Sequence, residues 1–365
     1  MKRMKNKILA ILMAVILLGT SLGSIILPDQ AFSDSERRGL AQFPQLSLKN
    51  LGNGSFMSLF EKYTLDQFPL RDSLRGVKAA VALRIFGQED NNQLYEEDGY
   101  LVSMEYPGDK ASFERAAQRF TNVYEMYLKD SDTKVYLSVI PDKNYFMAEK
   151  SGHLSMDYAS LVGGMTESLS YMEYIDIMDS LSIEDYYLTD SHWKQTALPE
   201  TADVLASAMG QSLSLSYEMV TLEHPFYGVY YGQFALPVEP DILTYLTNPI
   251  VEQLVVYDHQ NQKEIPVYDM EKAQGKDPYE LFLGGPLSLV TLENPNCDNG
   301  KELIIFRDSF GSSIAPLLAE AYSKVTLVDI RYMQPAMLGE YMDFENQDVL
   351  FLYSTSLLNN SSTLK

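Results

Sequence analysis

The spacing of apolar residues predicts several helices in the first third of the chain. From Phe56 to Phe68 the apolar positions have the period of an amphipathic helix, which Pro69 ends. A second helix is predicted to follow as far as Phe86, and residues 108–129 repeat the amphipathic pattern. The intervening "YEEDGYLV" predicts a β-hairpin with a tight turn at its Asp-Gly pair.

Short apolar runs rich in β-branched residues predict strands that alternate with these helices. Two of them, "KVYLSVIP" and "YIDIMDSL", lie before residue 182, and a helix is predicted at about 193–209. Three more follow residue 300, within "ELIIFRDS", "KVTLVDIRY" and "DVLFLYS". Because helices separate them, we expect parallel strands of one sheet and an α/β fold. Residues 210–300 are rich in Tyr, Pro and Gly and predict an inserted β-rich segment.

The N-terminus has the pattern of an export signal. Four basic residues precede an uncharged apolar run from Ile8 to Leu27, which is also long enough to span a bilayer. We therefore expect either a retained anchor or cleavage near Ala31 to Ser33. The expected organisation is a signal peptide or membrane anchor at 1–33, an N-terminal lead-in at 34–107, and a main domain at 108–365 with the β-rich insertion at about 210–300.

Charge and cysteine content exclude several classes of function. The 365-residue chain has a net charge of −22, which argues against binding to nucleic acid. Its single cysteine, Cys297, allows neither an internal disulfide nor a cysteine-based metal site. The acidic runs "EEDGY" and "MDFENQD" do not have the ligand spacing of a calcium loop. We predict no metal and no cofactor.

The stretch "LIIFRDSFGSS" is the best candidate for chemistry. It predicts a buried strand that ends at Arg307-Asp308, with Ser309 in the following turn and a helix close behind. In open α/β sheets this end of a strand is where ligands bind, and the helix N-terminus and neighbouring amides can stabilise an oxyanion. Gly311 would let the backbone approach a substrate closely. Alternatively, Asp308 or Ser309 only caps the helix.

A serine nucleophile needs a base and a residue that orients the base. His192 in "TDSHW" has Asp190 two residues before it, whereas the other three histidines occur in sequences typical of surface loops and turns. If Asp190 accepts a hydrogen bond from His192, the imidazole is free to take the proton of Ser309. Asp190 could instead cap the predicted helix that follows.

Five short motifs, in this order along the chain, resemble the DHHW proteins and the related alginate O-acetylation proteins of the SGNH hydrolase-like superfamily. They are the N-terminal "SERRGLAQFP" with "DQFPLRDSLRG", "VIPDKNYF", "TDSHW", "LIIFRDSFGSS" and "VTLVDIRY". The resemblance runs from about Ser35 to the end of the chain. It implies an SGNH hydrolase-like three-layer sandwich with a parallel sheet. Asp190 and His192 match the family's Asp-x-His pair, and Ser309 matches its nucleophile.

Other positions also match, or depart from, the family pattern. Arg331 matches an arginine that could shape or charge the site, although a salt bridge with Asp329 or Asp308 would explain it as well. Lys143 matches a position whose role the residues do not reveal, and Trp193 could stack on a sugar or anchor the core. The departures are Ser191, in place of the first histidine of the family's name, and Gly285-Pro286, in place of a Gly-Asn that would supply an oxyanion donor.

The resemblance implies an O-acetyltransferase or acetylesterase that acts on a cell-surface polysaccharide through an acetyl-serine intermediate. Such a protein would work outside the cytoplasm, membrane-anchored or secreted, and a transferase would need a membrane-bound partner that supplies acetyl groups. The alternative is a noncatalytic carbohydrate-binding or scaffold protein with the same fold, which the missing Gly-Asn and the 25 tyrosines favour. Retention of Asp190, His192 and Ser309 together favours catalysis.

Overall fold

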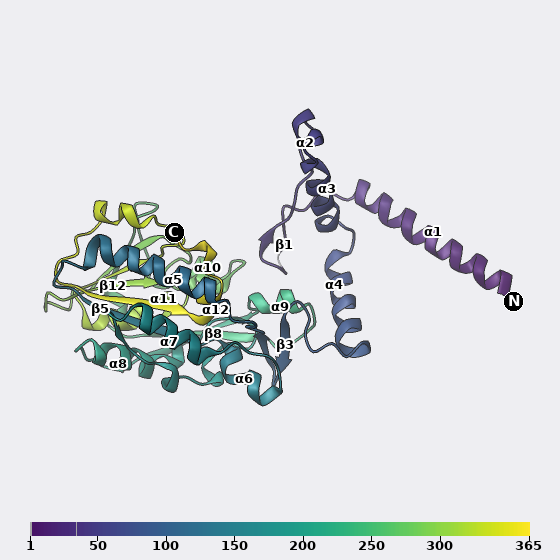
Figure 1. Cartoon of the computed structure of the whole chain (residues 1–365). Helices are drawn as coiled ribbons and strands as arrows, with labels where there is room; N and C mark the ends of the chain where they lie inside the picture. The colour runs from purple at the N-terminus through teal and green to yellow at the C-terminus, as the bar shows by residue number, and fades with distance from the viewer. Residues whose placement is uncertain (1, 34) are drawn as a thin grey trace. The chain divides into compact units, whose positions relative to one another are not determined.

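A computed structural model describes residues 2–33 and 35–365 of the chain (Figure 1). It divides the chain into two compact units. The N-terminal unit comprises the described residues up to Asn92 together with Tyr231–Pro237. The large unit comprises Gln93–Tyr230 and Val238–Lys365.

The N-terminal unit is mainly helical. Helix α1 (Lys2–Ile26) contains a segment, Met4–Ile26, that is long and apolar enough to cross a membrane. This fits the predicted signal peptide or anchor. The remaining elements are the two-stranded β1 (Phe32–Ser33) and β2 (Arg38–Gly39), α2 (Leu48–Gly52), α3 (Ser55–Asp66), α4 (Arg71–Ala80) and the π-helical turn η1 (Val81–Ile85). Helix α3 ends before Pro69, as predicted, and α4 with η1 forms the expected second helix.

An eight-stranded sheet forms the centre of the large unit. Its order is β10-β9-β11-β13-β12-β14-β5-β6, and the five strands from β13 to β6 are parallel. The predicted α/β fold with a parallel sheet is therefore confirmed. The strands are β5 (Lys134–Ile140), β6 (Glu173–Tyr174), β9 (Val255–Asp258), β10 (Lys263–Ile265), β11 (Leu289–Glu293), β12 (Glu302–Arg307), β13 (Lys324–Val328) and β14 (Asp348–Ser354).

The structure corrects two of the predicted β regions. Of "YIDIMDSL" only Tyr174 lies in the short edge strand β6, because the chain turns into a 3₁₀ helix at Met178–Ser180. Within residues 210–300, strands β9, β10 and β11 are antiparallel and extend the central sheet, so they are not a separate insertion. The other two strands there, β7 (Glu218–Phe226) and β8 (Asp241–Thr247), form a two-stranded sheet of their own.

Helices cover both faces of the sheet and make three layers (Figure 1). In β12 the side chains of Leu303 and Ile305 pack with α8 and α11, while Ile304 and Phe306 pack with α5, α7 and α12. This alternation places the two hydrophobic cores on opposite faces. The helices are α5 (Lys110–Val123), α6 (Lys143–Ser151), α7 (Tyr158–Ser168), α8 (Pro199–Ala208), α9 (Val229–Phe234), α10 (Met270–Ala273), α11 (Gly311–Leu318) and α12 (Thr355–Asn359). The predicted hairpin is β3 (Leu94–Glu97) and β4 (Tyr100–Ser103).

Candidate active site

Ser309 lies in a tight turn at the carboxyl end of β12, immediately before α11. The preceding Asp308 holds this turn in place. Its Oδ2 accepts hydrogen bonds from the backbone N–H of Ser354 at 2.9 Å and from its hydroxyl at 2.7 Å, at the end of neighbouring β14. Its Oδ1 accepts from the N–H of Phe310 at 3.1 Å. Asp308 therefore fixes the position of Ser309 and does more than cap a helix.

The loop before α8 brings His192 and Asp190 to Ser309. The Nε2 atom of His192 lies 2.7 Å from Ser309 Oγ, and its Nδ1 atom lies 2.5 Å from Asp190 Oδ1. The three side chains that the sequence singled out are therefore joined by hydrogen bonds. The alternative of Asp190 as a helix cap does not hold, because α8 begins only at Pro199. The helix predicted from residue 193 was wrong over its first turns, which contain a 3₁₀ helix at Gln195–Ala197.

The partners of Asp190 determine how the proton is placed on the imidazole. The Asp190 side chain is 2% exposed, and its Oδ2 accepts a hydrogen bond from the backbone N–H of Val229 at 2.8 Å. A carboxylate only accepts, so the Nδ1 atom of His192 donates to Oδ1. The Nε2 atom is then left to accept from the hydroxyl of Ser309, which is the arrangement that a serine nucleophile and its general base require.

Residues that the sequence analysis missed hold the Asp190 loop. The carboxylate of Asp241 accepts from the backbone N–H groups of Leu188 and Thr189 and from the hydroxyl of Thr189, at 2.6–2.7 Å. The N–H of Gly228 donates to the same hydroxyl at 2.8 Å. A Cβ atom at Gly228 would lie 2.3 Å from the Asp190 Cβ, so only glycine fits there. The lone glycine in "HPFYGVYY" was the sequence signal available for this contact.

Lys143, the first residue of α6, contacts the same loop. Its side chain is buried, and Nζ donates to the backbone carbonyls of Tyr187 at 2.9 Å and Leu188 at 3.1 Å. The ammonium group is 5.1 Å from the ring centroid of Tyr230. Burial lowers the pKa of Lys143 to about 7. Lys143 therefore stabilises the loop that contains Asp190 through hydrogen bonds to its backbone, which gives this family position a structural role.

The lowered pKa of Lys143 makes a testable prediction about stability. Above pH 7 the native protein releases this proton, whereas the unfolded chain keeps it up to about pH 10.4. The unfolded state thus binds more protons in that interval, and the free energy of unfolding should rise with pH by up to about 1.4 kcal/mol per unit. Lys143→Met should lack this contribution. Urea unfolding of the full chain in detergent, followed by Trp193 fluorescence at several pH values, measures the free energy of unfolding of both proteins. The same dependence of this free energy on pH in the two proteins would contradict the prediction.

Aromatic side chains hold the imidazole on its other sides. The ring of Tyr279 stacks on His192 with the centroids 3.8 Å apart and the planes at 8°, and Phe310 packs against it at 4.8 Å. The hydroxyl of Tyr279, whose pKa is raised by burial, donates to Ser313 Oγ at 2.8 Å. Trp193 Nε1 donates to the same Oγ at 2.8 Å. Trp193 is fully buried, so it is a core anchor and offers no ring face to a sugar.

A pocket of about 210 Å³ opens at this site. Arg331 lines it and is fixed by Asp329, with Nη2 to Oδ2 at 2.6 Å and Nε to Oδ1 at 2.9 Å. Burial opposes the charge of this guanidinium, but its hydrogen bonds to Asp329 outweigh burial and raise its pKa. Arg331 therefore makes the expected salt bridge and also lies in the site. The other lining residues are His192, Asp277, Tyr279, Glu280, Phe282, Gly285, Pro286, Ser309, Ser312 and Tyr332.

Gly311 has a different role from the one expected. A Cβ atom there would lie 2.7 Å from the Cβ of Arg307, whose side chain is fully buried. The guanidinium of Arg307 lies 3.7 Å from Asp329, the residue that also binds Arg331. Glycine at 311 therefore lets α11 pack on Arg307, and the close approach is to this buried side chain and not to a substrate.

Two potential hydrogen-bond donors remain near Ser309 Oγ. Among the described residues, the backbone N–H of Ser309 and the hydroxyl of Ser312 have no hydrogen-bond partner. Ser312 lies in the first turn of α11 and lines the pocket. The Gly285-Pro286 segment also borders the pocket, but it carries no side-chain donor.

The other three histidines do not reach this site. His153 was expected at the surface; it is half-buried and stacks on Tyr95 with the centroids 3.7 Å apart. His224 lies in β7 and not in a loop, and it is exposed. The Nε2 of His259 lies 3.3 Å from the hydroxyl of Thr291, on the antiparallel part of the sheet.

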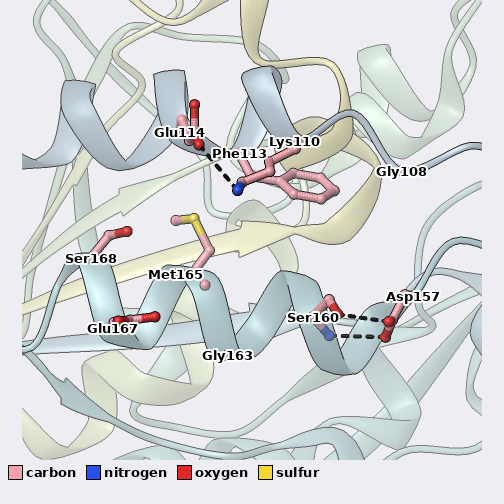
Figure 2. A pocket seen from close by; sticks show the side chains of 11 residues that line it. Gly108, Lys110, Phe113, Glu114, Asp157, Ser160, Gly163, Met165, Glu167 and Ser168 are labelled. Carbon is pink, nitrogen blue, oxygen red and sulfur yellow. Dashed lines mark hydrogen bonds and ion pairs between the residues drawn. The ribbon is translucent and has the colours of Figure 1, made fainter.

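A larger pocket of about 690 Å³ lies between α5 and α7, away from all predicted site residues (Figure 2). Figure 2 shows the ion pair between Lys110 and Glu114 and the hydrogen bonds from Ser160 to Asp157 on its rim. Asp157 is the N-cap of α7, so these hydrogen bonds have a structural purpose. A histidine beside a nucleophile is absent from the residues that line this pocket.

Known structures share the fold of this chain. The chain matches no protein-family model and no curated protein sequence. It is similar to a DHHW family protein from Eubacterium siraeum, with 22% identity and a TM-score of 0.59 over 75% of this chain and 95% of that one. It is also similar to Bacillus cereus PatB1 carrying a sulfonyl adduct, with 17% identity and a TM-score of 0.59 over 73% and 95%. At this identity the likeness establishes the fold, which agrees with the resemblance seen in the motifs.

Proposed function

We propose that the chain is a DHHW-type O-acetyltransferase or acetylesterase that works outside the cytoplasm on a cell-surface polysaccharide. The observation that carries the proposal is the continuous hydrogen-bonded chain from Asp190 through His192 to Ser309, which ends in a pocket. In this proposal Ser309 is the nucleophile, His192 the general base and Asp190 the residue that orients it. A scaffold protein would have no need of this arrangement.

The first half of the reaction would acylate Ser309. Its Oγ attacks the carbonyl carbon of the acetyl donor while its proton passes to Nε2 of His192, and Asp190 stabilises the imidazolium that forms. The backbone N–H of Ser309 and the hydroxyl of Ser312 would donate to the developing oxyanion. The intermediate then collapses, the donor oxygen leaves with the proton from His192, and acetyl-Ser309 remains.

The second half would release the acetyl group. A hydroxyl of the polysaccharide, or water, gives its proton to His192 and attacks the acetyl carbon. The bond from this carbon to Ser309 Oγ then breaks, and His192 returns the proton to Oγ, which restores Ser309. Attack by the polysaccharide makes the protein a transferase, and attack by water makes it an esterase. Transfer outside the cytoplasm needs a membrane-bound partner that relays acetyl groups, and retention of α1 as an anchor would place the site beside it.

An acylation assay tests the proposal. The full chain in detergent is mixed with p-nitrophenyl acetate, and both nitrophenol release and the mass of the intact protein are followed. We expect a burst of nitrophenol and one added acetyl group, because deacylation by water in such a mechanism is a separate step. Adding glycan oligomers should then speed turnover in a transferase and transfer the acetyl group to them.

A second reagent separates a silent enzyme from a noncatalytic protein. A small arylsulfonyl fluoride should modify Ser309 once, because it reacts with an activated serine and needs no natural acetyl donor. Absence of both the sulfonyl adduct and the acetyl adduct would contradict the proposal. Binding of the same glycans by that unreactive protein would then support the noncatalytic alternative.

A further inference from the structure

The helix formed by α4 and η1 has an exposed apolar face. Leu74, Val77 and Ile85 lie on it at helical spacing and are 47%, 59% and 71% exposed, respectively, and Leu70, the N-cap residue just before the helix, is 77% exposed. Phe86 extends the face and is 75% exposed. A helix normally buries such a stripe, and a contiguous exposed apolar face marks an interaction surface.

The opposite face of the same helix packs within the N-terminal unit. Ala79 is fully buried, and the guanidinium of Arg75 donates to the carbonyl of Gly232 at 2.8 Å. A Cβ atom at Gly76 would lie 3.2 Å from the carbonyl oxygen of Ala235. These contacts fix the rotation of the helix about its axis, so the apolar stripe is held facing outward.

The charge of this helix is opposite to that of the whole chain. Residues 69–87 contain four basic residues, Arg71, Arg75, Lys78 and Arg84, and one acidic residue, Asp72, although the chain carries −22. Lys78 and Arg84 flank the apolar stripe, since they are one residue away from Val77 and Ile85, respectively. An apolar face bordered by lysine and arginine is typical of a helix that lies in the surface of a bilayer with anionic lipids.

The position of the helix supports a lipid surface as its partner. In the chain it follows α1, the helix that could cross a membrane, after β1, β2, α2 and α3, but its start lies close to α1. A Cβ atom at Gly23 in α1 would lie 3.0 Å from Pro69, two residues before α4, and the hydroxyl of Tyr63 donates to Asp29 at 2.9 Å. The start of α4 therefore lies close to the C-terminal end of α1, and a membrane-anchored α1 would keep it near the outer surface of the membrane.

We propose that the stripe of Leu70, Leu74, Val77 and Ile85 lies in the interfacial region of the bilayer, and that Lys78 and Arg84 contact the headgroups of anionic phospholipids. The helix is then a second membrane attachment besides α1, and two attachments restrict the N-terminal unit to one orientation on the surface. This placement does not depend on the reaction proposed for Ser309.

Depth-dependent quenching tests this placement. The full chain, with Cys297→Ser as background, receives a single cysteine at Val77 or Ile85 and carries an environment-sensitive fluorophore there. The control positions are Asp72, on the same helix, and Lys110, which is 89% exposed in the large unit. Each variant is reconstituted into nanodiscs whose lipids carry a nitroxide near the headgroup.

We expect the labels at Val77 and Ile85 to be quenched severalfold more than those at Asp72 and Lys110. We also expect Lys78→Gln with Arg84→Gln to lower that quenching when the nanodiscs contain phosphatidylglycerol, and to change it little in pure phosphatidylcholine. Equal quenching at all four positions would overturn the proposal. Labels that are shielded from water-soluble quenchers in native membranes, but not in lipid nanodiscs, would also overturn it, in favour of a protein partner on this face.

Discussion

Replacing Ser309 with alanine should abolish acetyl transfer and lower the rate by at least about 10³-fold, which corresponds to about 4 kcal/mol of transition-state stabilisation. The reason is that Ser309 Oγ is the acyl acceptor of the proposed mechanism, and it is the atom that is hydrogen-bonded to His192 Nε2, at 2.7 Å. The variant should fold normally, since the side chain is small and Asp308 holds the turn without it. Nitrophenol release in the steady state and the mass of the intact protein measure the loss.

Two further variants make the Ser309 result specific. His192→Ala should cost nearly as much, and the double variant should cost little more than either single one, because the two residues act as a unit. Ser168→Ala, an exposed serine at the end of α7, is the matched control and should keep full activity. Losses from Ser309→Ala and His192→Ala that simply add up would show that the two side chains act independently, against the proposed mechanism.

Much of the fold could be predicted because its elements are defined by local patterns. Four of the five parallel strands, β5, β12, β13 and β14, follow apolar runs, and the helix before β5 has a clear period over residues 108–129. The end of β12 could be placed because "LIIF" is followed at once by polar residues. The antiparallel strands β9 to β11 could not be assigned to the central sheet, since the pairing of β11 with β13 and with β9 depends on contacts distant in the sequence.

The candidate site could be predicted only in part for the same reason. Asp190 and His192 are neighbours in the sequence, and the family resemblance connected them to Ser309. Tyr279 and Asp241 gave no such signal, because each is one of many tyrosines or aspartates and acts through tertiary packing. Trp193 and Gly311 were assigned correct positions near the site, but their burial, which decides their roles, is a property of the folded chain.

Among the glycines around the candidate site, Gly228 is the one where an added methyl group, as in Gly228→Ala, is expected to have the largest effect on activity. The added Cβ would lie 2.3 Å from the Cβ of Asp190 and 2.4 Å from its backbone N, so the backbone on one side must move. Such overpacking typically costs about 1–3 kcal/mol of stability. The movement also breaks the Asp190 contact with the N–H of Val229 and shifts the carboxylate from Nδ1 of His192. We therefore expect activity to fall by about 10²-fold or more in protein that is still folded.

Comparison with Asp190→Asn and Gly164→Ala identifies the cause of this loss. Asp190→Asn keeps the shape of the side chain but can donate to Nδ1, so it favours the wrong tautomer and should reduce activity by up to about 10⁴-fold without a large change in stability. Gly164→Ala adds the same methyl group at a helical position with no atom within 4 Å, and it should be neutral or slightly stabilising. Activity and urea unfolding are measured on all three. If Gly228→Ala loses activity only in proportion to its unfolded fraction, Gly228 contributes to stability alone, and the position of Asp190 is not what limits the reaction.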